Sequence, residues 1–491
     1  MKTRKSGVLL PVSSLPGRYG IGDFGKDAKR FIDILAKYRF AYWQILPLNP
    51  VGYGHSPYQP YSSFALDEIF IDLDDLHERG YISAQKKRNT DAKRVNFEDV
   101  RAFKLPLLRR AYEKNMKANP HCLDKFITEN PWVKDYGAFM MFHRRYNASW
   151  DAWPEEAKRW VESKPKFGRE ENRDYKFEIY LQMVAYRQWG EIHKYAKKKG
   201  VEIIGDVPFY VGFDSCDVYA NQDTFLLDPE SKQPSFIAGV PPDYFSATGQ
   251  RWGNPIYDWD KLSKERFAFL TDRIKRNAKL YDVIRLDHFR AFDTFWKIPS
   301  SCETAVDGEW IEAPGYAFFD TLFAEAPQLK EKIIAEDLGD LRPEVLVLRD
   351  HYDFPGMNVV EFTFEDDVFL QKEDWRLVNS VVYLGTHDND TMKGFFDKMK
   401  EEDQAKWLDA LRARGYEEVT PTDKMIHFAL DKEANTVILT VQDILNIDSE
   451  GRINVPGEVD EINWTWKLLD FSALKAKLPM IEEMMANAKR I

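Results

Sequence analysis

The sequence predicts an α/β protein, a (β/α)8 TIM barrel with long loop insertions and no C-terminal β-sandwich domain. Three apolar runs carry this prediction, and each leads into an acid: Val283–Leu286 into Asp287, Ile333–Ala335 into Glu336, and Val381–Leu384 into Asp388. The acids lie about 50 residues apart, roughly one βα unit plus an insertion. A buried parallel strand is a nearly continuous apolar run, and in a barrel its carboxyl end opens into the site. With 491 residues and a 44% hydrophobic composition, the chain can bury such a core.

Eight strands can be counted in order along the chain. We expect them at residues 7–10, 41–46, 201–207, 283–286, 333–335, 357–364, 381–384 and 435–441. A helix is expected over residues 26–38, between the first two strands. Because little chain follows the eighth strand, we expect a single catalytic domain over residues 1–491.

Two insertions are expected between these strands. Residues 72–195 are rich in Lys, Arg, Glu and Trp, and their apolar residues recur at helical spacing, which predicts a mainly helical insertion after the second strand. Residues 212–262 form the second insertion, after the third strand. Within this insertion, Gly and Pro recur between Gly239 and Pro255, which is typical of an exposed loop held by rigid turns. The aromatic residues of this loop include Tyr244, Phe245 and Trp252.

The composition excludes several classes of protein and site. The net charge is −11 with both signs interspersed, so no basic surface for nucleic acid is expected. No apolar run is long enough to span a membrane and no signal-peptide core follows the N-terminus, so we expect no membrane segment and a cytoplasmic location. Three widely spaced cysteines, Cys122, Cys216 and Cys302, fit neither a disulfide framework nor a zinc site.

Two short patterns could indicate a cofactor or a metal, and we interpret both as structural. Residues 20–25 match the dinucleotide fingerprint G-x-G-x-x-G, yet they do not follow a strand directly, and the next strand ends without a ribose-binding acid. Asp72, Asp74 and Asp75 lack the glycine and the distal Glu of a calcium-binding loop. We expect a structural loop at the first pattern and a solvated loop or a helix start at the second.

The three acids at strand ends suit the chemistry of glycosidic bonds. Two carboxyl groups must flank the bond, so that one attacks or activates water and the other donates a proton to the leaving oxygen. Side chains alternate along a strand, so Arg285 and Asp287 point the same way, and the cation favours an ionised carboxylate. Such acids can instead cap helices or pair with arginine. Three of them, with Arg285 and His387 alongside, favour a catalytic site.

Further motifs accompany the acids and resemble those of a known family. They are LPVSSLPG at 10–17, GHSPY at 54–58, GDVPFYV at 205–211, RWGNP at 251–255, NVPG at 454–457 and NWTW at 463–466. Together with the acidic strand ends, they resemble the 4-α-glucanotransferases known as amylomaltases or disproportionating enzymes, which are relatives of the α-amylases. The resemblance extends from about residue 7 to residue 468.

The resemblance implies roles for individual residues. Asp287 would be the nucleophile and Glu336 the acid/base, while Asp388 would bind sugar hydroxyls at the cleavage subsite and favour a distorted ring. Contacts to donor or acceptor sugars would come from Ser56, Tyr58, Asp206, Trp252, Arg285, His387 and Asn454. Tyr244 and Phe245 are expected beside Trp252 in a loop that closes over the cleft, excludes bulk water and stacks the acceptor ring. Alternatively, this loop packs against the helical insertion.

The reaction implied by the resemblance retains the configuration at the anomeric carbon. A donor α-1,4-glucan is cleaved, the glycosyl unit rests on Asp287, and a sugar 4-hydroxyl replaces water as acceptor. The expected partners are α-1,4-glucans and malto-oligosaccharides, with glucose as an acceptor, and no cofactor or metal is implied. Two alternatives stay open: an α-1,4-glucan hydrolase with the same carboxylates, and a non-catalytic glucan-binding barrel. Maltotriose separates them, because a transferase forms glucose and longer chains, a hydrolase forms shorter sugars, and a binding protein forms neither.

Overall fold

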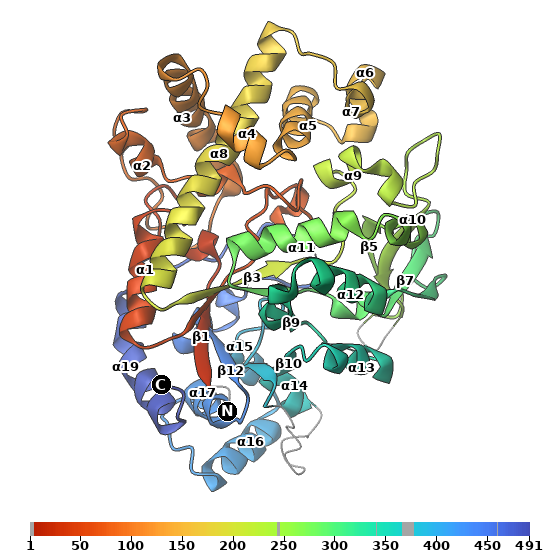
Figure 1. The fold of residues 1–491 in the computed structure, drawn as a ribbon. Coiled ribbons are helices and arrows are strands. Elements are labelled where there is room, and N and C mark those ends of the chain that lie inside the picture. The colour runs from red at the N-terminus through yellow and green to blue at the C-terminus, as the bar shows by residue number, and fades with distance from the viewer. Residues whose placement is uncertain (1–3, 243–245, 340, 366–377, 459) are drawn as a thin grey trace.

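The computed structural model describes residues 4–242, 246–339, 341–365, 378–458 and 460–491. Its centre is a sheet of eight parallel strands in the order β10-β11-β12-β1-β2-β3-β6-β9 (Figure 1). The strands are β1 (Lys5–Leu9), β2 (Tyr42–Gln44), β3 (Glu202–Val207), β6 (Val283–Leu286), β9 (Ile333–Ala335), β10 (Gly356–Val359), β11 (Ser380–Tyr383) and β12 (Thr436–Thr440). The N–H of Ala335 in β9 donates to the carbonyl of Pro355, just before β10, at 2.9 Å. The two outer strands therefore meet, and the predicted (β/α)8 barrel is confirmed.

The barrel has a packed interior rather than a pore. Leu9, Ile204 and Ile438 point inward and belong to one buried cluster, whereas Val8 and Val437 belong to the larger cluster between the strands and the helices. Because side chains alternate between the two faces of a strand, each strand contributes to both layers.

Helices surround the barrel and dominate the segment between β2 and β3. In that segment lie α2 (Leu73–Glu78), α3 (Phe97–Ala118), α4 (Asp124–Glu129), α5 (Val133–Tyr146), α6 (Glu155–Lys158), α7 (Trp160–Ser163) and α8 (Arg169–Lys198). Asp72 accepts a hydrogen bond from the N–H of Asp74 and caps α2, so the acidic cluster begins a helix. The division of the chain into one barrel domain and two insertions stays a prediction.

The remaining helices follow the strands along the chain. They are α1 (Lys26–Lys37), α9 (Cys216–Ala220), α10 (Trp259–Lys264), α11 (Ala268–Leu280), α12 (Gly315–Glu325), α13 (Pro343–His351), α14 (Val360–Glu365), α15 (Met392–Lys398), α16 (Glu401–Ala413), α17 (Pro421–Asp431), α18 (Val441–Ile444) and α19 (Ser472–Asn487). The strand expected over 357–364 is therefore too long, because β10 ends at Val359 and α14 begins at the next residue. Both elements contain several apolar residues, and a short stretch rich in apolar residues does not by itself distinguish a strand from a buried helix.

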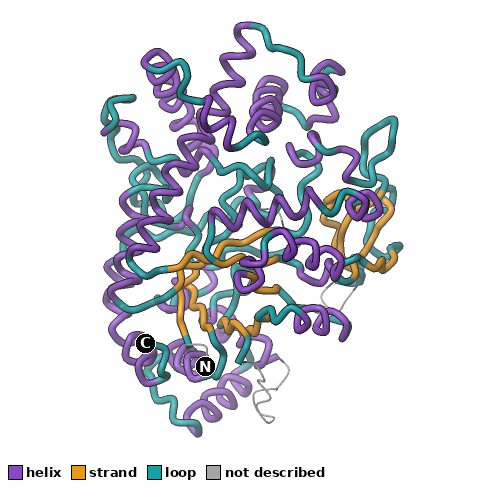
Figure 2. Tube along the Cα trace, in the orientation of Figure 1, coloured by secondary structure: helices purple, strands orange, loops and turns teal. Residues whose placement is uncertain are grey.

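A second sheet was not expected from the sequence. It is antiparallel, has the order β5-β4-β7-β8, and forms a separate group of strands beside the barrel (Figure 2). Its strands are β4 (Phe236–Val240), β5 (Gln250–Pro255), β7 (Thr294–Pro299) and β8 (Glu309–Glu312). Residues 250–255, expected within an exposed loop, thus form a strand that carries Trp252. The residues 243–245 between β4 and β5 lie outside the described part of the chain.

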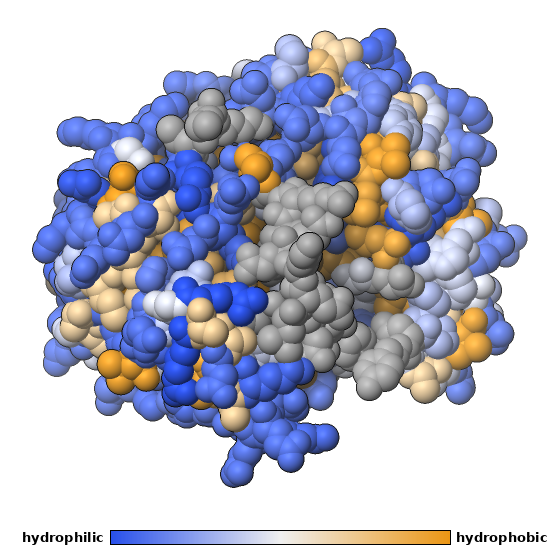
Figure 3. Space-filling model, turned by 90° about the horizontal axis from the view of Figure 1, so that it is seen from below, coloured by the Kyte–Doolittle hydropathy of each residue, from blue (hydrophilic) through white to orange (hydrophobic). Residues whose placement is uncertain are grey.

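The first and last described segments of the chain lie close together at the amino ends of the barrel strands (Figure 1). The Arg490 guanidinium donates to the carbonyls of Leu430 at 2.6 Å, Ala434 at 3.1 Å and Lys5 at 3.2 Å, which ties the C-terminus to β1 and to the entry into β12. One face of the molecule is mostly hydrophilic, with hydrophobic residues in scattered groups (Figure 3). None of the helices in the described ranges is both long and apolar enough to cross a lipid bilayer.

Candidate active site

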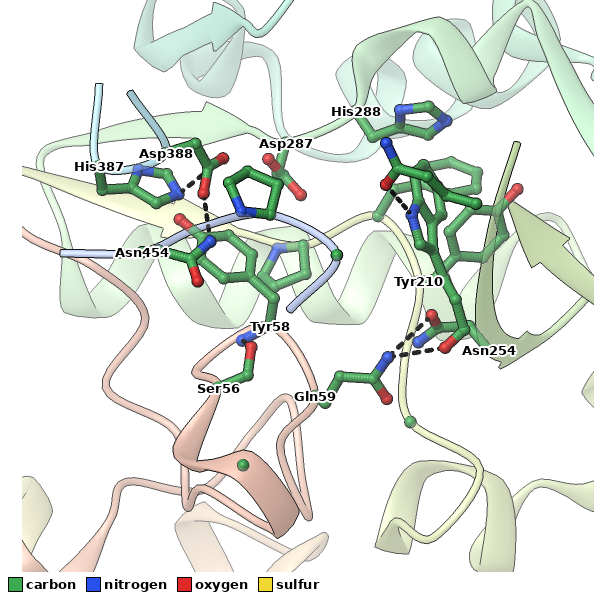
Figure 4. A pocket seen from close by; sticks show the side chains of 18 of the residues that line it. Ser56, Tyr58, Gln59, Tyr210, Asn254, Asp287, His288, His387, Asp388 and Asn454 are labelled. Carbon is green, nitrogen blue, oxygen red and sulfur yellow. Dashed lines mark hydrogen bonds and ion pairs between the residues drawn. The ribbon is translucent and has the colours of Figure 1, made fainter. Parts of the chain in front are cut away.

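A cleft of about 940 Å³ opens at the carboxyl ends of the barrel strands. Nine of the residues predicted from the sequence line it: Ser56, Tyr58, Trp252, Arg285, Asp287, Glu336, His387, Asp388 and Asn454. In Figure 4, Asp287 lies between two groups, with His387, Asp388 and Asn454 on one side and His288, Tyr210 and Asn254 on the other. Tyr244 and Phe245, also predicted, lie outside the described residues.

Asp206 lies beneath the cleft rather than in its lining. It is 1% exposed and accepts hydrogen bonds from Arg285 Nη1, at 2.9 and 2.8 Å, and from the Tyr58 hydroxyl, at 2.7 Å. The preceding Gly205 lets the ring of Tyr281 pack against the strand, because a Cβ there would lie 2.1 Å from that ring. Asp206 thus holds two cleft residues from below, and its predicted contact with sugar stays a prediction.

Arg285 joins Asp206 to Asp287. Its Nη1 also donates to Asp287 Oδ1 at 2.8 Å, as expected for a residue on β6 and one just after its end, two positions apart. The Arg285 side chain is 4% exposed, and the two neighbouring carboxylates hold its pKa above the usual value despite the burial. A permanently charged donor therefore contacts Asp287, which is what a carboxylate nucleophile requires.

Glu336 has a different environment from Asp287. Its carboxyl group accepts the N–H of His288 at 2.7 Å and the N–H of Leu338 at 3.0 Å. Burial, together with the negative charge of nearby Asp287, raises the pKa of Glu336 to about 7, although Arg285 and the two N–H donors oppose this rise. At neutral pH a large fraction of Glu336 is therefore protonated and can donate a proton.

Asp388 is positioned by the segment that follows β12. Asn454 Nδ2 donates to Asp388 Oδ1 at 2.6 Å, and His387 Nε2 lies 3.4 Å from Asp388 Oδ2. Arg452 donates to the backbone carbonyls of both Asp388, at 2.7 Å, and Asn454, at 2.8 Å. The His387 ring stacks on Tyr58, with centroids 5.1 Å apart and planes at 9°. These contacts fix Asp388 with its carboxylate 44% exposed to the cleft.

The opposite wall is formed by the second sheet and the segments that bind to it. Gln59 Nε2 donates to the carbonyl of Trp252 at 3.0 Å and to Asn254 Oδ1 at 3.2 Å. The Trp252 and His288 rings meet edge to face, with centroids 4.9 Å apart at 87°. Burial lowers the pKa of His288 to about 4, so this ring is neutral at physiological pH.

Several residues that shape the cleft were missed in the sequence analysis. Gln59 and His288 directly follow named site residues, and each could have been found from its neighbour. Asn254 belongs to the motif at 251–255, although no contact was assigned to it, whereas Arg452 gave no signal of its own. Both act through backbone carbonyls or contacts between distant segments. Among the described residues, no group of three His, Cys, Asp or Glu side chains is arranged to hold a metal ion.

The chain is similar to known proteins over nearly its whole length. Residues 10–472 match a family model described as 4-alpha-glucanotransferase. The 4-alpha-glucanotransferase of Synechocystis sp. is 40% identical over 478 residues, 94% of each chain, and that of Thermus thermophilus is 39% identical over 487 residues, 95% of each chain. Among solved structures, the amylomaltase from Streptococcus agalactiae in complex with acarbose has a TM-score of 0.92 at 33% identity and covers 99% of both chains.

Proposed function

The chain belongs to the 4-alpha-glucanotransferase family and is a retaining transferase of α-1,4-glucans, and we propose that Asp287, Glu336 and Asp388 carry its reaction. The observation that carries this proposal is the contrast between two neighbouring carboxyl groups. Arg285 donates a charged hydrogen bond to Asp287, whereas burial raises the pKa of Glu336 to about 7. Pairs of acids whose environments differ in this way provide one nucleophile and one proton donor.

In the first half of the reaction, the Asp287 carboxylate attacks the anomeric carbon of a glucose unit in the donor. The glycosidic oxygen leaves with the proton of Glu336, so the shortened donor departs with a free 4-hydroxyl. Asp287 is then an uncharged ester. Because the charge of Asp287 is one cause of the raised pKa of Glu336, its loss lowers that pKa and suits Glu336 to act as a base.

In the second half, the 4-hydroxyl of an acceptor attacks the same carbon. Glu336 takes the hydroxyl proton, the new α-1,4 bond forms, and the ester to Asp287 breaks. Glucose and malto-oligosaccharides are the proposed acceptors. Asp388, held by Asn454 and Arg452, is proposed to bind the hydroxyls of the glucose unit that is being transferred.

The test is incubation of the purified enzyme with maltotriose, followed by product analysis. We expect glucose together with maltopentaose and longer chains. Glucose and maltose without longer chains would instead indicate a hydrolase, and unchanged maltotriose would indicate a binding protein. A cytoplasmic location stays a prediction.

A further inference from the structure

A buried cation lies behind the cleft, where the proposed mechanism does not use it. Arg273 is in α11 and is 3% exposed. It lines a small void of about 10 Å³ whose lining also includes Asp287, so it reaches the back of the strand end that carries the proposed nucleophile.

The Arg273 guanidinium binds three segments that come from distant parts of the sequence. It donates to the carbonyls of Pro208 at 2.7 Å and Phe209 at 2.8 Å, to the hydroxyl of Tyr257 at 2.9 Å, and to Ser63 Oγ at 3.1 Å. The Tyr257 hydroxyl also donates to the backbone carbonyl of Phe209 at 2.8 Å. A planar guanidinium with five fixed donors can hold three segments at once, which the compact ammonium of lysine cannot reproduce.

Each of these segments supplies part of one cleft wall. Pro208 and Phe209 line the cleft themselves. Ser63 belongs to the loop that presents Tyr58 and Gln59, and Tyr257 follows β5, which presents Trp252. Gln59 and the Trp252 carbonyl are also hydrogen-bonded to each other.

The charge of Arg273 is balanced through Ser63 rather than by direct contact. Ser63 donates its hydroxyl to Asp217 Oδ1 at 2.6 Å and its N–H to Asp217 Oδ2 at 2.7 Å, and Asp217 is 2% exposed. Because a buried charge is costly unless it is fully hydrogen-bonded, this network favours one arrangement of the three segments over others.

We propose that Arg273 is a positioning residue that fixes the cleft wall formed by Gln59, Phe209 and Trp252. The opposite wall, around Asp388, is held separately by Asn454 and Arg452. Arg273 therefore affects the placement of the acceptor sugar on the Trp252 side more than the cleavage of the donor. The proposal rests on the proposed function, because it assumes that this wall receives the acceptor.

The experiment compares Arg273→Lys with Arg490→Lys. Arg490 is a matched control, because it is 4% exposed and also donates to several carbonyls, but at the amino ends of the strands, far from the cleft. Transfer and hydrolysis on maltotriose are measured together, along with the KM for glucose as acceptor and the Tm.

For Arg273→Lys we expect the hydrolysis-to-transfer ratio and the acceptor KM to rise about fivefold or more, with cleavage of the donor reduced less. Arg490→Lys should lower the Tm and leave both quantities unchanged. If Arg273→Lys does not fold, Tyr257→Phe and Ser63→Ala, which each remove one hydroxyl from the network, should raise the ratio about twofold.

The experiment distinguishes a failure of the proposed function from a failure of the inference about Arg273. If the wild-type enzyme forms no product longer than maltotriose, the proposed function is wrong. If the wild type transfers normally, but folded Arg273→Lys, or both milder variants, keep the wild-type ratio and acceptor KM, then Arg273 has a structural role alone and the inference is overturned.

Discussion

Two buried arginines at opposite ends of the barrel, Arg285 and Arg490, have different kinds of partner. At the carboxyl ends, Arg285 contacts Asp206 and Asp287, so its partners are carboxylates beside a cleft. At the amino ends, Arg490 donates to backbone carbonyls, and Arg4 donates to one of the same carbonyls, that of Leu430, as well as to that of Ala488. Carbonyls have no charge to change, whereas the charge of Asp287 disappears and returns in each proposed catalytic cycle. One end of the fold is therefore proposed to carry the chemistry, whereas the contacts at the other end contribute to stability.

The largest effect is expected from the nucleophile. Asp287→Asn should lower transfer by at least about a thousandfold, since an amide oxygen is a poor nucleophile and loss of a nucleophile costs on that order. Steady-state transfer on maltotriose measures the effect, and an unchanged circular dichroism spectrum and Tm would show that the fold is intact. Substantial transfer by the pure, folded variant would mean that the catalytic carboxylate lies elsewhere.

Glu336→Gln tests whether Glu336 is the proton donor and separates its role from that of Asp287. Transfer from maltodextrins should fall by about a hundredfold or more, because the leaving oxygen receives no proton. An α-glucosyl fluoride needs no such proton, so it should still form a covalent intermediate. Mass spectrometry of the trapped enzyme should place the label on Asp287, and a label on another residue would contradict the assignment.

The pH dependence follows from the raised pKa of Glu336. Glu336 must be protonated for cleavage, so kcat/KM for maltotriose should fall as the pH rises through about 7, with a slope that approaches tenfold per pH unit. With an α-glucosyl fluoride, formation of the intermediate should lack this fall. A profile that stays flat to pH 9 with maltotriose would contradict the role of Glu336.

A smaller effect is expected at the loop between β4 and β5. Phe245→Ala, or shortening between Pro242 and Gly249, should raise the hydrolysis-to-transfer ratio severalfold without abolishing cleavage, because the loop is proposed to exclude water. Glucose and reducing ends released from maltotriose are measured together. An unchanged ratio with normal folding would mean that another part of the chain keeps water out.

The smallest effect on activity is expected at the amino ends of the strands. Arg490→Ala removes hydrogen bonds to Leu430, Ala434 and Lys5, so the free energy of unfolding should fall by about 2–4 kcal/mol. Thermal unfolding measures this change. Below the new Tm, kcat for transfer should equal that of the wild type. A large loss of kcat would contradict the view that the amino ends of the strands contribute to stability and not to the reaction.

The eight strands of the barrel and the three acids at strand ends could be predicted from the sequence, although the strand expected over 357–364 was too long. These features are local: an apolar run ending in charge marks a strand end, and alternation along the strand puts Arg285 and Asp287 on one side. Tertiary structure decided the rest. The second sheet pairs β4 with strands on both sides, including β7, whose paired residues lie about 60 positions later, so a pattern typical of a loop became β5. Asp206 lies below the cleft because Arg285 and Tyr58 cover it. Arg273 links three distant segments because each of them places a hydrogen-bond acceptor beside its guanidinium group. Such contacts depend on where chain segments meet in space, which no spacing along the sequence encodes.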